Sequence, residues 1–137
     1  MCGNKGPIFV YSHFEGTCIK GLAKRFSKLA PALLAIEGRL VDLLKITEEY
    51  YYNPSQHGHW RIKDVLPAIA PDLSYKELEG VQDGTMAMLA YLDATDPKTT
   101  PKRKAEIEQQ LLAYCNLDTL AMVRLWQVLA GRKDLKF

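Results

Sequence analysis

The sequence predicts an α/β fold that is mostly helical and contains few strands. A short run of β-branched and aromatic residues near the N-terminus, PIFVYS, is typical of a buried strand. Most of the remaining chain repeats its apolar residues at helical spacing. The 137 residues are 47% hydrophobic and 25% charged, which is typical of a globular chain long enough to bury a core. We therefore expect a single domain over residues 1–137.

The first half of the chain predicts a strand, two helices and a mixed segment. The strand covers residues 7–12, and helical spacing begins at about Thr17, with Ile19, Leu22, Ala23, Phe26 and Leu29 on one face and Lys20, Lys24 and Lys28 on another. Pro31 starts a second helix, which Gly38 ends. The segment RLVDLLKITEEYYY is compatible with strand and helix, and we expect a short extended piece that passes into a helix.

The second half predicts a loop followed by three helices. NPSQHGHW is a loop by its Asn-Pro, Gly and Ser content, and RIKDVLPAIAPDLSY is a short helix stopped by its two prolines. A helix covers residues 82–92, and a polar, proline-containing loop follows it. The last helix runs from about residue 101 to residue 130 and ends at Gly131.

A single strand cannot satisfy its own backbone hydrogen bonds, so the strand at 7–12 needs partners. Either further strands lie within 39–61, or the other strands of the sheet lie upstream in a longer polypeptide. We favour the second alternative.

Composition and motifs exclude several classes of protein. The three cysteines lack Cys-x-x-Cys spacing, which argues against a disulfide framework or a zinc site and favours a cytoplasmic protein. No apolar run approaches the length of a membrane span, and there is no signal-peptide pattern, so no membrane partner is expected. Walker loops, dinucleotide fingerprints and nucleophile elbows are missing from the sequence. The net charge of +2 is too small to indicate a nucleic-acid binder by itself, and it does not exclude one.

Asp118 is the most informative single residue, because the last helix places it on an apolar stripe. The stripe contains Ile107, Leu111, Tyr114, Met122, Leu125 and Leu129, and the opposite side contains Gln109, Asn116 and Gln127. A buried carboxylate is costly without a partner. Tyr114 lies one turn before Asp118 on the same face, where its phenol can orient a metal-bound water or simply pack. The competing interpretations are a surface acid or a core acid paired with an arginine such as Arg124.

Other polar groups give weaker indications. Glu15 follows the strand and leads into a helix, where α/β sheets place functional groups, but it also suits a carboxylate stabilised by a helix N-terminus. His57 and His59 alternate like two metal ligands, although their loop favours ordinary surface histidines. The clusters of Lys and Arg residues are typical of solvated helix faces. The first cluster, Lys20, Lys24, Arg25 and Lys28, can instead follow a phosphate backbone if Glu15 and Asp118 form a metal site.

VYSHFEG and YCNLDTLAMVRL together resemble the second and third motifs of ribonuclease H-like 3′–5′ exonucleases of the DnaQ type, in the tyrosine subclass. The whole chain also resembles an uncharacterised bacterial domain-of-unknown-function family with a predicted nuclease relationship. YSHFE, VDLL, IKDVLPAIAPDLSYKEL, QDGTMAMLAYL and YCNLDTLAMV carry that likeness. It implies a partial ribonuclease H-like fold, of which this chain forms the C-terminal portion.

The resemblance implies metal-dependent phosphodiester hydrolysis. Glu15 and Asp118 would be ligands for Mg²⁺ or Mn²⁺, Tyr114 would orient the attacking water, and Ser12, Lys20 and Lys24 would contact a single strand or 3′ end of nucleic acid. Two departures limit this activity. The first motif, Asp-x-Glu, must precede the second, and the fourteen residues before Glu15 contain no acid. Active exonucleases usually have Asp in place of Glu15.

We therefore expect an incomplete nuclease domain that has no strong activity as this chain alone, because a pair of hard cations needs several oxygen ligands. The alternative is a non-catalytic module that binds nucleic acid or protein on a degenerate nuclease-like fold. A plain helical scaffold is the third hypothesis, and it predicts Asp118 on the surface and far from Glu15.

Overall fold

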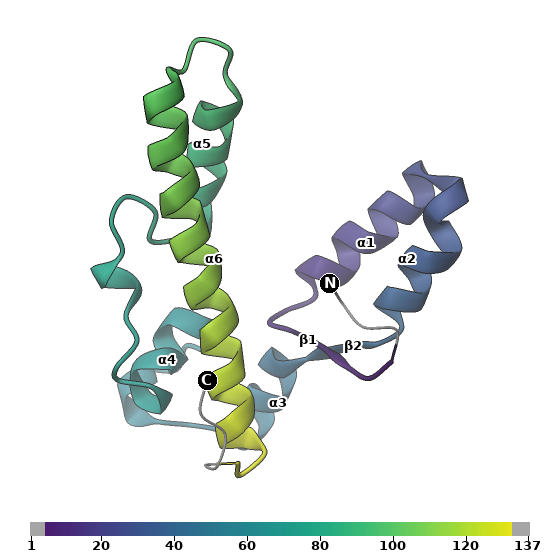
Figure 1. Ribbon diagram of the computed structural model, residues 1–137. Helices are drawn as coiled ribbons and strands as arrows, with labels where there is room; N and C mark the ends of the chain where they lie inside the picture. Colours follow the sequence, from purple (N-terminus) through teal and green to yellow (C-terminus); the bar gives the residue numbers. More distant parts are fainter. Residues whose placement is uncertain (1–4, 133–137) are drawn as a thin grey trace.

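The computed structural model describes residues 5–132, and Figure 1 shows two helical arms rising from a common base. One arm is the α1–α2 pair, and the other is the α5–α6 pair. The strands, α3, α4 and the C-terminal half of α6 form the base. The elements are β1 (Ile8–Val10), α1 (Phe14–Arg25), α2 (Ala30–Glu37), β2 (Leu40–Asp42), α3 (Leu43–Tyr50), α4 (Ile62–Ile69), α5 (Gly84–Thr95) and α6 (Pro101–Leu129). Three single 3₁₀ turns lie at Ser27–Leu29, Pro54–Gln56 and Tyr75–Glu77.

The two strands pair in parallel, with Ile8 opposite Leu40 and Val10 opposite Asp42. A parallel pair needs a crossover connection, which α1 and α2 provide. The expectation that the first strand must find its partners outside the chain is therefore wrong for one partner, since β2 lies within the 39–61 segment. Three residues are too few for an alternation pattern to identify a strand.

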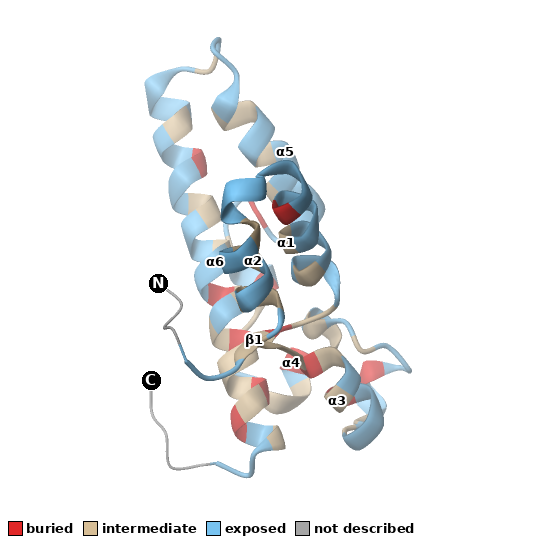
Figure 2. Cartoon of the chain, turned by 90° about the vertical axis from the view of Figure 1, so that its right-hand side faces the viewer, coloured by how far each residue is buried: buried red, intermediate tan, exposed pale blue. Residues whose placement is uncertain are grey.

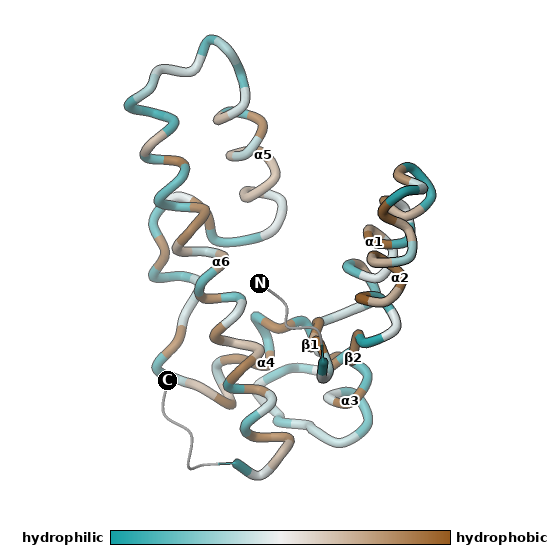
Figure 3. The backbone as a smooth tube through the Cα atoms, turned by 45° about the vertical axis from the view of Figure 1, so that its right-hand side comes forward, coloured by the Kyte–Doolittle hydropathy of each residue, from teal (hydrophilic) through white to brown (hydrophobic). Residues whose placement is uncertain are grey.

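The α1–α2 arm follows the predicted helices and exposes much of its apolar surface. Helix α1 begins three residues earlier than expected, at Phe14, whose backbone N–H donates to the Ser12 hydroxyl at 3.2 Å. Helix α2 has its proline in the first turn and ends before Gly38, as predicted. On the expected apolar face only Ala23 is buried, whereas Leu22, Phe26 and Leu29 are exposed. Figure 3 shows these apolar stretches along both helices.

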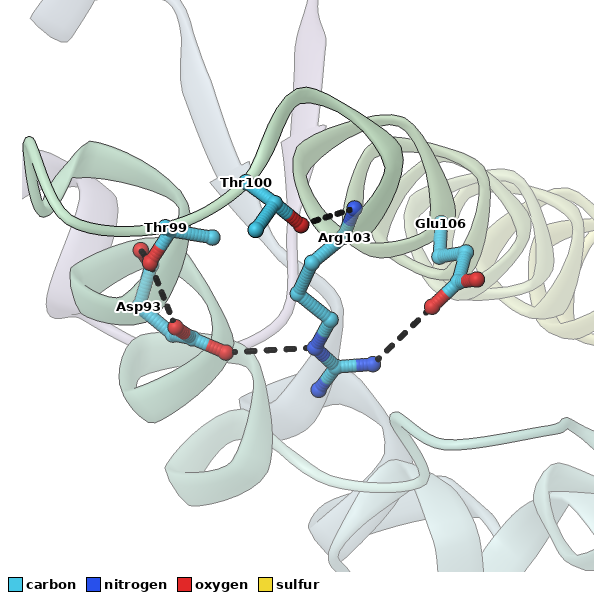
Figure 4. A network of polar contacts seen from close by, with 5 residues as sticks. All are labelled: Asp93, Thr99, Thr100, Arg103 and Glu106. Carbon is cyan, nitrogen blue, oxygen red and sulfur yellow. Dashed lines mark hydrogen bonds and ion pairs between the residues drawn. The ribbon is translucent and has the colours of Figure 1, made fainter.

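Helices α5 and α6 form an antiparallel hairpin that a polar network closes. Thr100 caps α6 by accepting from the Arg103 backbone N–H at 3.3 Å. The Arg103 side chain reaches Asp93 at 3.3 Å and Glu106 at 3.6 Å, and the Thr99 hydroxyl donates to Asp93 at 2.9 Å (Figure 4). Helix α6 ends before a positive-φ Gly131, which confirms the predicted end.

The core lies where α4 crosses α6, and buried residues concentrate there and at the base (Figure 2). One cluster joins α4 and α6 to the turn at Tyr75–Glu77, and it contains Leu66, Ala70, Tyr75, Leu117 and Ala121. The second joins α3, α4 and α6 through Leu43, Val65 and Leu125, with Phe9 and Tyr11 packed against it. Helix α4 therefore holds both clusters together.

Three details correct the expected pattern. Pro67 lies inside α4 and does not stop it, whereas the helix does end before the second proline, Pro71; the Ala70 N–H still donates to the Leu66 carbonyl at 2.8 Å. Gln127 is buried although the helical wheel places it opposite the apolar stripe, and its backbone carbonyl accepts from the Arg132 N–H at 2.8 Å. Helix α5 begins at Gly84, where the Asp83 side chain caps it, and not at residue 82.

Candidate functional site

Asp118 lies on the inward side of α6, half-buried, and its partner is a tyrosine. The Tyr75 hydroxyl donates to Asp118 Oδ1 at 2.5 Å. Tyr75 is only 8% exposed, and its ring packs on the Tyr114 ring with centroids 6.0 Å apart and planes tilted by 53°. Arg124, considered above as a partner, instead pairs with Asp72 at 2.9 Å. Asp118 therefore meets two phenols and not a guanidinium.

Both phenols are held in the neutral form. Burial raises the pKa of Tyr75 well above its ordinary value, and the hydrogen bond to Asp118 raises it further. Burial and the Asp118 carboxylate raise the pKa of Tyr114 to about 12. Both groups therefore remain donors at neutral pH, and neither neutralises the carboxylate.

Asp118 lies beside the core cluster around Tyr75, because the buried α6 residues on either side of it in the sequence belong to that cluster. Leu117 and Ala121 belong to the cluster around Tyr75. Leu125, with Met122 packed against it, belongs to the cluster that contacts Phe9 of β1. The Asp118 carboxylate therefore lies at the edge of the Tyr75 cluster, one turn before Met122.

The carboxyl ends of the parallel strands form a second polar site. Ser12 follows β1 with a backbone φ of +119°, a conformation that is costly for a residue with a side chain. Its N–H donates to Asp42 Oδ1 at 3.0 Å, and the same oxygen caps α3 by accepting from the Leu44 N–H at 3.0 Å. A cavity of about 180 Å³ lies there, lined in part by Ser12, His13, Lys20, Glu37, Asp42 and Lys45. Open α/β sheets bind their ligands at this edge.

Asp42 is the residue that sequence reasoning missed. The available indication was VDLL, an Asp directly before an apolar helical run, which is typical of an N-cap. The same position ends the strand beside β1, so one carboxylate both caps α3 and holds the strained turn at Ser12.

The other predicted site residues lie on the surface of the α1 arm. Glu15 is exposed in the first turn of α1, where a helix N-terminus favours a carboxylate. Lys20 pairs with Glu37 of α2 at 3.0 Å, and Lys24 is exposed in the last turn of α1. Within residues 5–132, no hydrogen bond or ion pair joins Glu15 to Asp118 or Tyr114. The structure therefore brings Tyr114 and Asp118 together and leaves Glu15 apart from their contacts.

Metal-ligating groups are sparse in the described part of the chain. It contains no group of three or more His, Cys, Asp or Glu side chains placed to hold a metal ion. His57 and His59 are exposed, as expected for surface histidines. Cys18 and Cys115 are free and exposed, and Cys2 lies outside the described residues. Among residues 5–132, no helix has both the length and the apolar character needed to cross a membrane.

Comparison with known proteins finds a similarity to a described family in the N-terminal part of the chain. Neither the curated proteins nor the solved structures contain a significant match. The profile of a family described as a domain of unknown function (DUF2779) matches residues 1–61, which include β1, α1, α2, β2, α3 and the strand-end cavity residues.

Proposed function

We propose that this chain forms part of a metal-dependent nuclease domain of the ribonuclease H-like, DnaQ type. In this proposal Asp118 is a ligand for Mg²⁺ or Mn²⁺, and Tyr114 orients the attacking water. The observation that carries the proposal is the environment of Asp118. Its carboxylate is half-buried between two neutral phenols, and within residues 5–132 it has no ion pair with a Lys, Arg or His side chain. A partly desolvated carboxylate without a cationic partner is costly, and a bound cation would offset that cost.

The chain alone supplies too few ligands for a pair of ions. Bound divalent ions would activate a water and neutralise the leaving oxygen of a phosphodiester. Hard cations require several oxygen ligands, and Asp118 supplies one carboxylate. Glu15, at the start of α1, is the second carboxylate that the proposal assigns. We therefore expect full activity only in a longer polypeptide that also contains an Asp-x-Glu strand.

The strand-end cavity is the place where we expect the nucleic-acid backbone to bind. Ser12 and Lys20 line this cavity, and Lys24 lies one turn further along α1. The Lys20–Glu37 pair is solvent-exposed on the lysine side, with 59% of that side chain accessible, so a phosphate can replace Glu37 at little cost. Lysines near a phosphate backbone contribute affinity without sequence preference.

The direct test is hydrolysis of labelled single-stranded DNA and RNA by a longer polypeptide that contains both this chain and the Asp-x-Glu strand. We expect Mg²⁺- or Mn²⁺-dependent cleavage that Asp118→Ala lowers by at least about 100-fold, since loss of even an indirect contact to a metal costs 10–100-fold. Asp72→Ala is the matched control, because Asp72 is an exposed acid whose partner is Arg124. Activity that survives Asp118→Ala overturns the proposal.

A second candidate is a non-catalytic nucleic-acid-binding module on the same fold. Residues 5–132 contain no group of three or more side chains placed to hold a metal ion, and this observation favours the binding module. It predicts binding of single strands whose affinity falls with salt, and no metal-dependent cleavage by the longer polypeptide.

A further inference from the structure

A second cavity lies apart from the strand ends and reaches the Asp118 site only through the ring of Tyr75. Its volume is about 470 Å³, and its walls come from the loop after α3, from α4 and from the segment between α4 and α5. None of the residues assigned to the nuclease site lines it. The volume lies within the range of small-molecule sites, which is about 300–1,000 Å³. The cavity is therefore large enough for a nucleotide-sized ligand.

One wall of the cavity is apolar and presents a surface for a flat organic group. Leu66 and Pro67 of α4 lie there, together with Leu73 and with Met86 of α5. The buried Tyr75 ring also lines the cavity. Ligand sites commonly combine such an apolar wall with a few polar groups that fix orientation.

The polar rim of the cavity consists mainly of basic side chains that can donate hydrogen bonds to a ligand. Lys63, Lys76, His57 and His59 line the cavity, and none of them forms an ion pair within residues 5–132. An ammonium group and an imidazole N–H both donate to phosphate oxygens. These four side chains are exposed, so a ligand can reach them without a change in the fold.

The two acids in the lining already have partners. Asp64 accepts from the Arg61 guanidinium at 2.5 and 3.2 Å, so its charge is neutralised. Asp83 accepts from the Met86 N–H at 2.9 Å as the cap of α5, where the helix N-terminus stabilises a negative charge. The lysines therefore retain a positive charge that no neighbouring carboxylate satisfies.

Two side-chain amides fix the loops that carry these donors. Gln56 is 1% exposed; its Oε1 accepts from the Asn53 N–H at 2.8 Å, and its Nε2 donates to the His59 carbonyl at 3.2 Å. Gln82 Nε2 donates to the Leu78 carbonyl at 2.8 Å and to the Lys76 carbonyl at 3.3 Å. The donors therefore sit on preorganised loops, which lowers the entropy cost of binding.

We propose that this cavity binds an organic phosphomonoester of the size of a nucleoside monophosphate. The phosphate contacts Lys63, Lys76 and the two imidazoles, and the flat organic group lies on the apolar wall. This inference does not depend on the nuclease proposal, because it uses different residues and requires no metal ion.

The test is a titration of the chain with AMP, followed by amide chemical shifts in NMR spectra. We expect saturable shifts at His57, Lys63 and Lys76, and an affinity at least about tenfold weaker for adenosine and for inorganic phosphate, since each lacks one half of the recognised group. Lys63→Gln and Lys76→Gln should each weaken AMP binding about five- to tenfold and leave adenosine binding unchanged. Both lysines are exposed, so neither change should affect folding.

Lys98→Gln is the matched control, because Lys98 is exposed in the loop after α5 and lies outside the cavity lining. Equal weakening in this control would show that bulk charge, not the cavity, attracts AMP. If adenosine binds as tightly as AMP, the phosphate does not contribute to binding and the proposal is wrong. If inorganic phosphate binds as tightly as AMP, the apolar wall does not contribute and the proposal is also wrong. No saturable shift at about 1 mM AMP would also overturn the proposal.

Discussion

The Tyr75 hydroxyl should stabilise the fold through Asp118, and Tyr75→Phe isolates that contribution. The change keeps the ring, and with it the packing on Tyr114, and removes the O–H that donates to Asp118 at 2.5 Å. A hydrogen bond to a charged group contributes about 1.5–3 kcal/mol. Asp118 is only half-buried, so water replaces part of the lost bond. We expect the free energy of unfolding to fall by about 1–2 kcal/mol.

The assay is equilibrium unfolding in urea, followed by the fluorescence of Trp60 and Trp126. Tyr91→Phe is the control, since Tyr91 is 61% exposed, and it should change stability by less than about 0.5 kcal/mol. In an Asp118→Asn background the effect of Tyr75→Phe should shrink toward the range of a neutral hydrogen bond, about 0.5–1.5 kcal/mol. A loss no larger than that of the control, or one unchanged in the Asn background, refutes the reasoning.

Three further predictions concern alkaline pH and packing. Tyr75 and Tyr114 have raised pKa values in the folded state, so the stabilisation that they provide is complete below about pH 10 and is lost as the pH rises toward 12 and above. Urea unfolding at a series of pH values should show that the free energy of unfolding falls by up to about 1.4 kcal/mol per pH unit because of the buried Tyr75. The fall should be shallower in Tyr75→Phe. Gly80→Ala should lower the free energy of unfolding in urea by about 1–2 kcal/mol, since Gly80 has φ +76° and a Cβ there would lie 2.3 Å from a glutamine side chain of α6. Gly21→Ala should instead raise it by about 0.5–1 kcal/mol, because Gly21 lies inside α1 and a Cβ there would meet open space. Equal effects of the two changes would contradict this account. Leu125→Ala should cost about 2–5 kcal/mol in the same assay, because Leu125 is fully buried between α3 and α4, and a loss below 1 kcal/mol would mean that this cluster is not the core.

Local sequence pattern predicts the long elements of this fold well and the short ones poorly. Helix α6 spans 29 residues between Thr100 and Gly131, and its length gives the apolar periodicity many repeats. Strand β2 has three residues, too few for any periodicity, although Asp42 marks its end. The exposed apolar face of α1 shows the limit of periodicity, which predicts a face but not what covers it.

The sequence pattern likewise predicts part of the candidate site and misses the rest. The helical wheel predicts that Asp118 and Tyr114 share the inward face of α6, and the structure confirms it. The partner, Tyr75, lies 43 residues earlier in a single 3₁₀ turn, and no local pattern links the two. The contact between Ser12 and Asp42 spans 30 residues and depends on the parallel pairing of the strands. Such contacts follow from tertiary packing.

The measurement that tests the central claim most directly is a Mn²⁺ titration of the chain, followed by paramagnetic broadening of its NMR signals. The account predicts that broadening at low Mn²⁺ centres on Tyr114 and Asp118, that Asp118→Asn abolishes it, and that Asp72→Asn does not. Broadening that centres elsewhere, or that persists in Asp118→Asn, would contradict the claim that Asp118 faces inward to hold a metal ion.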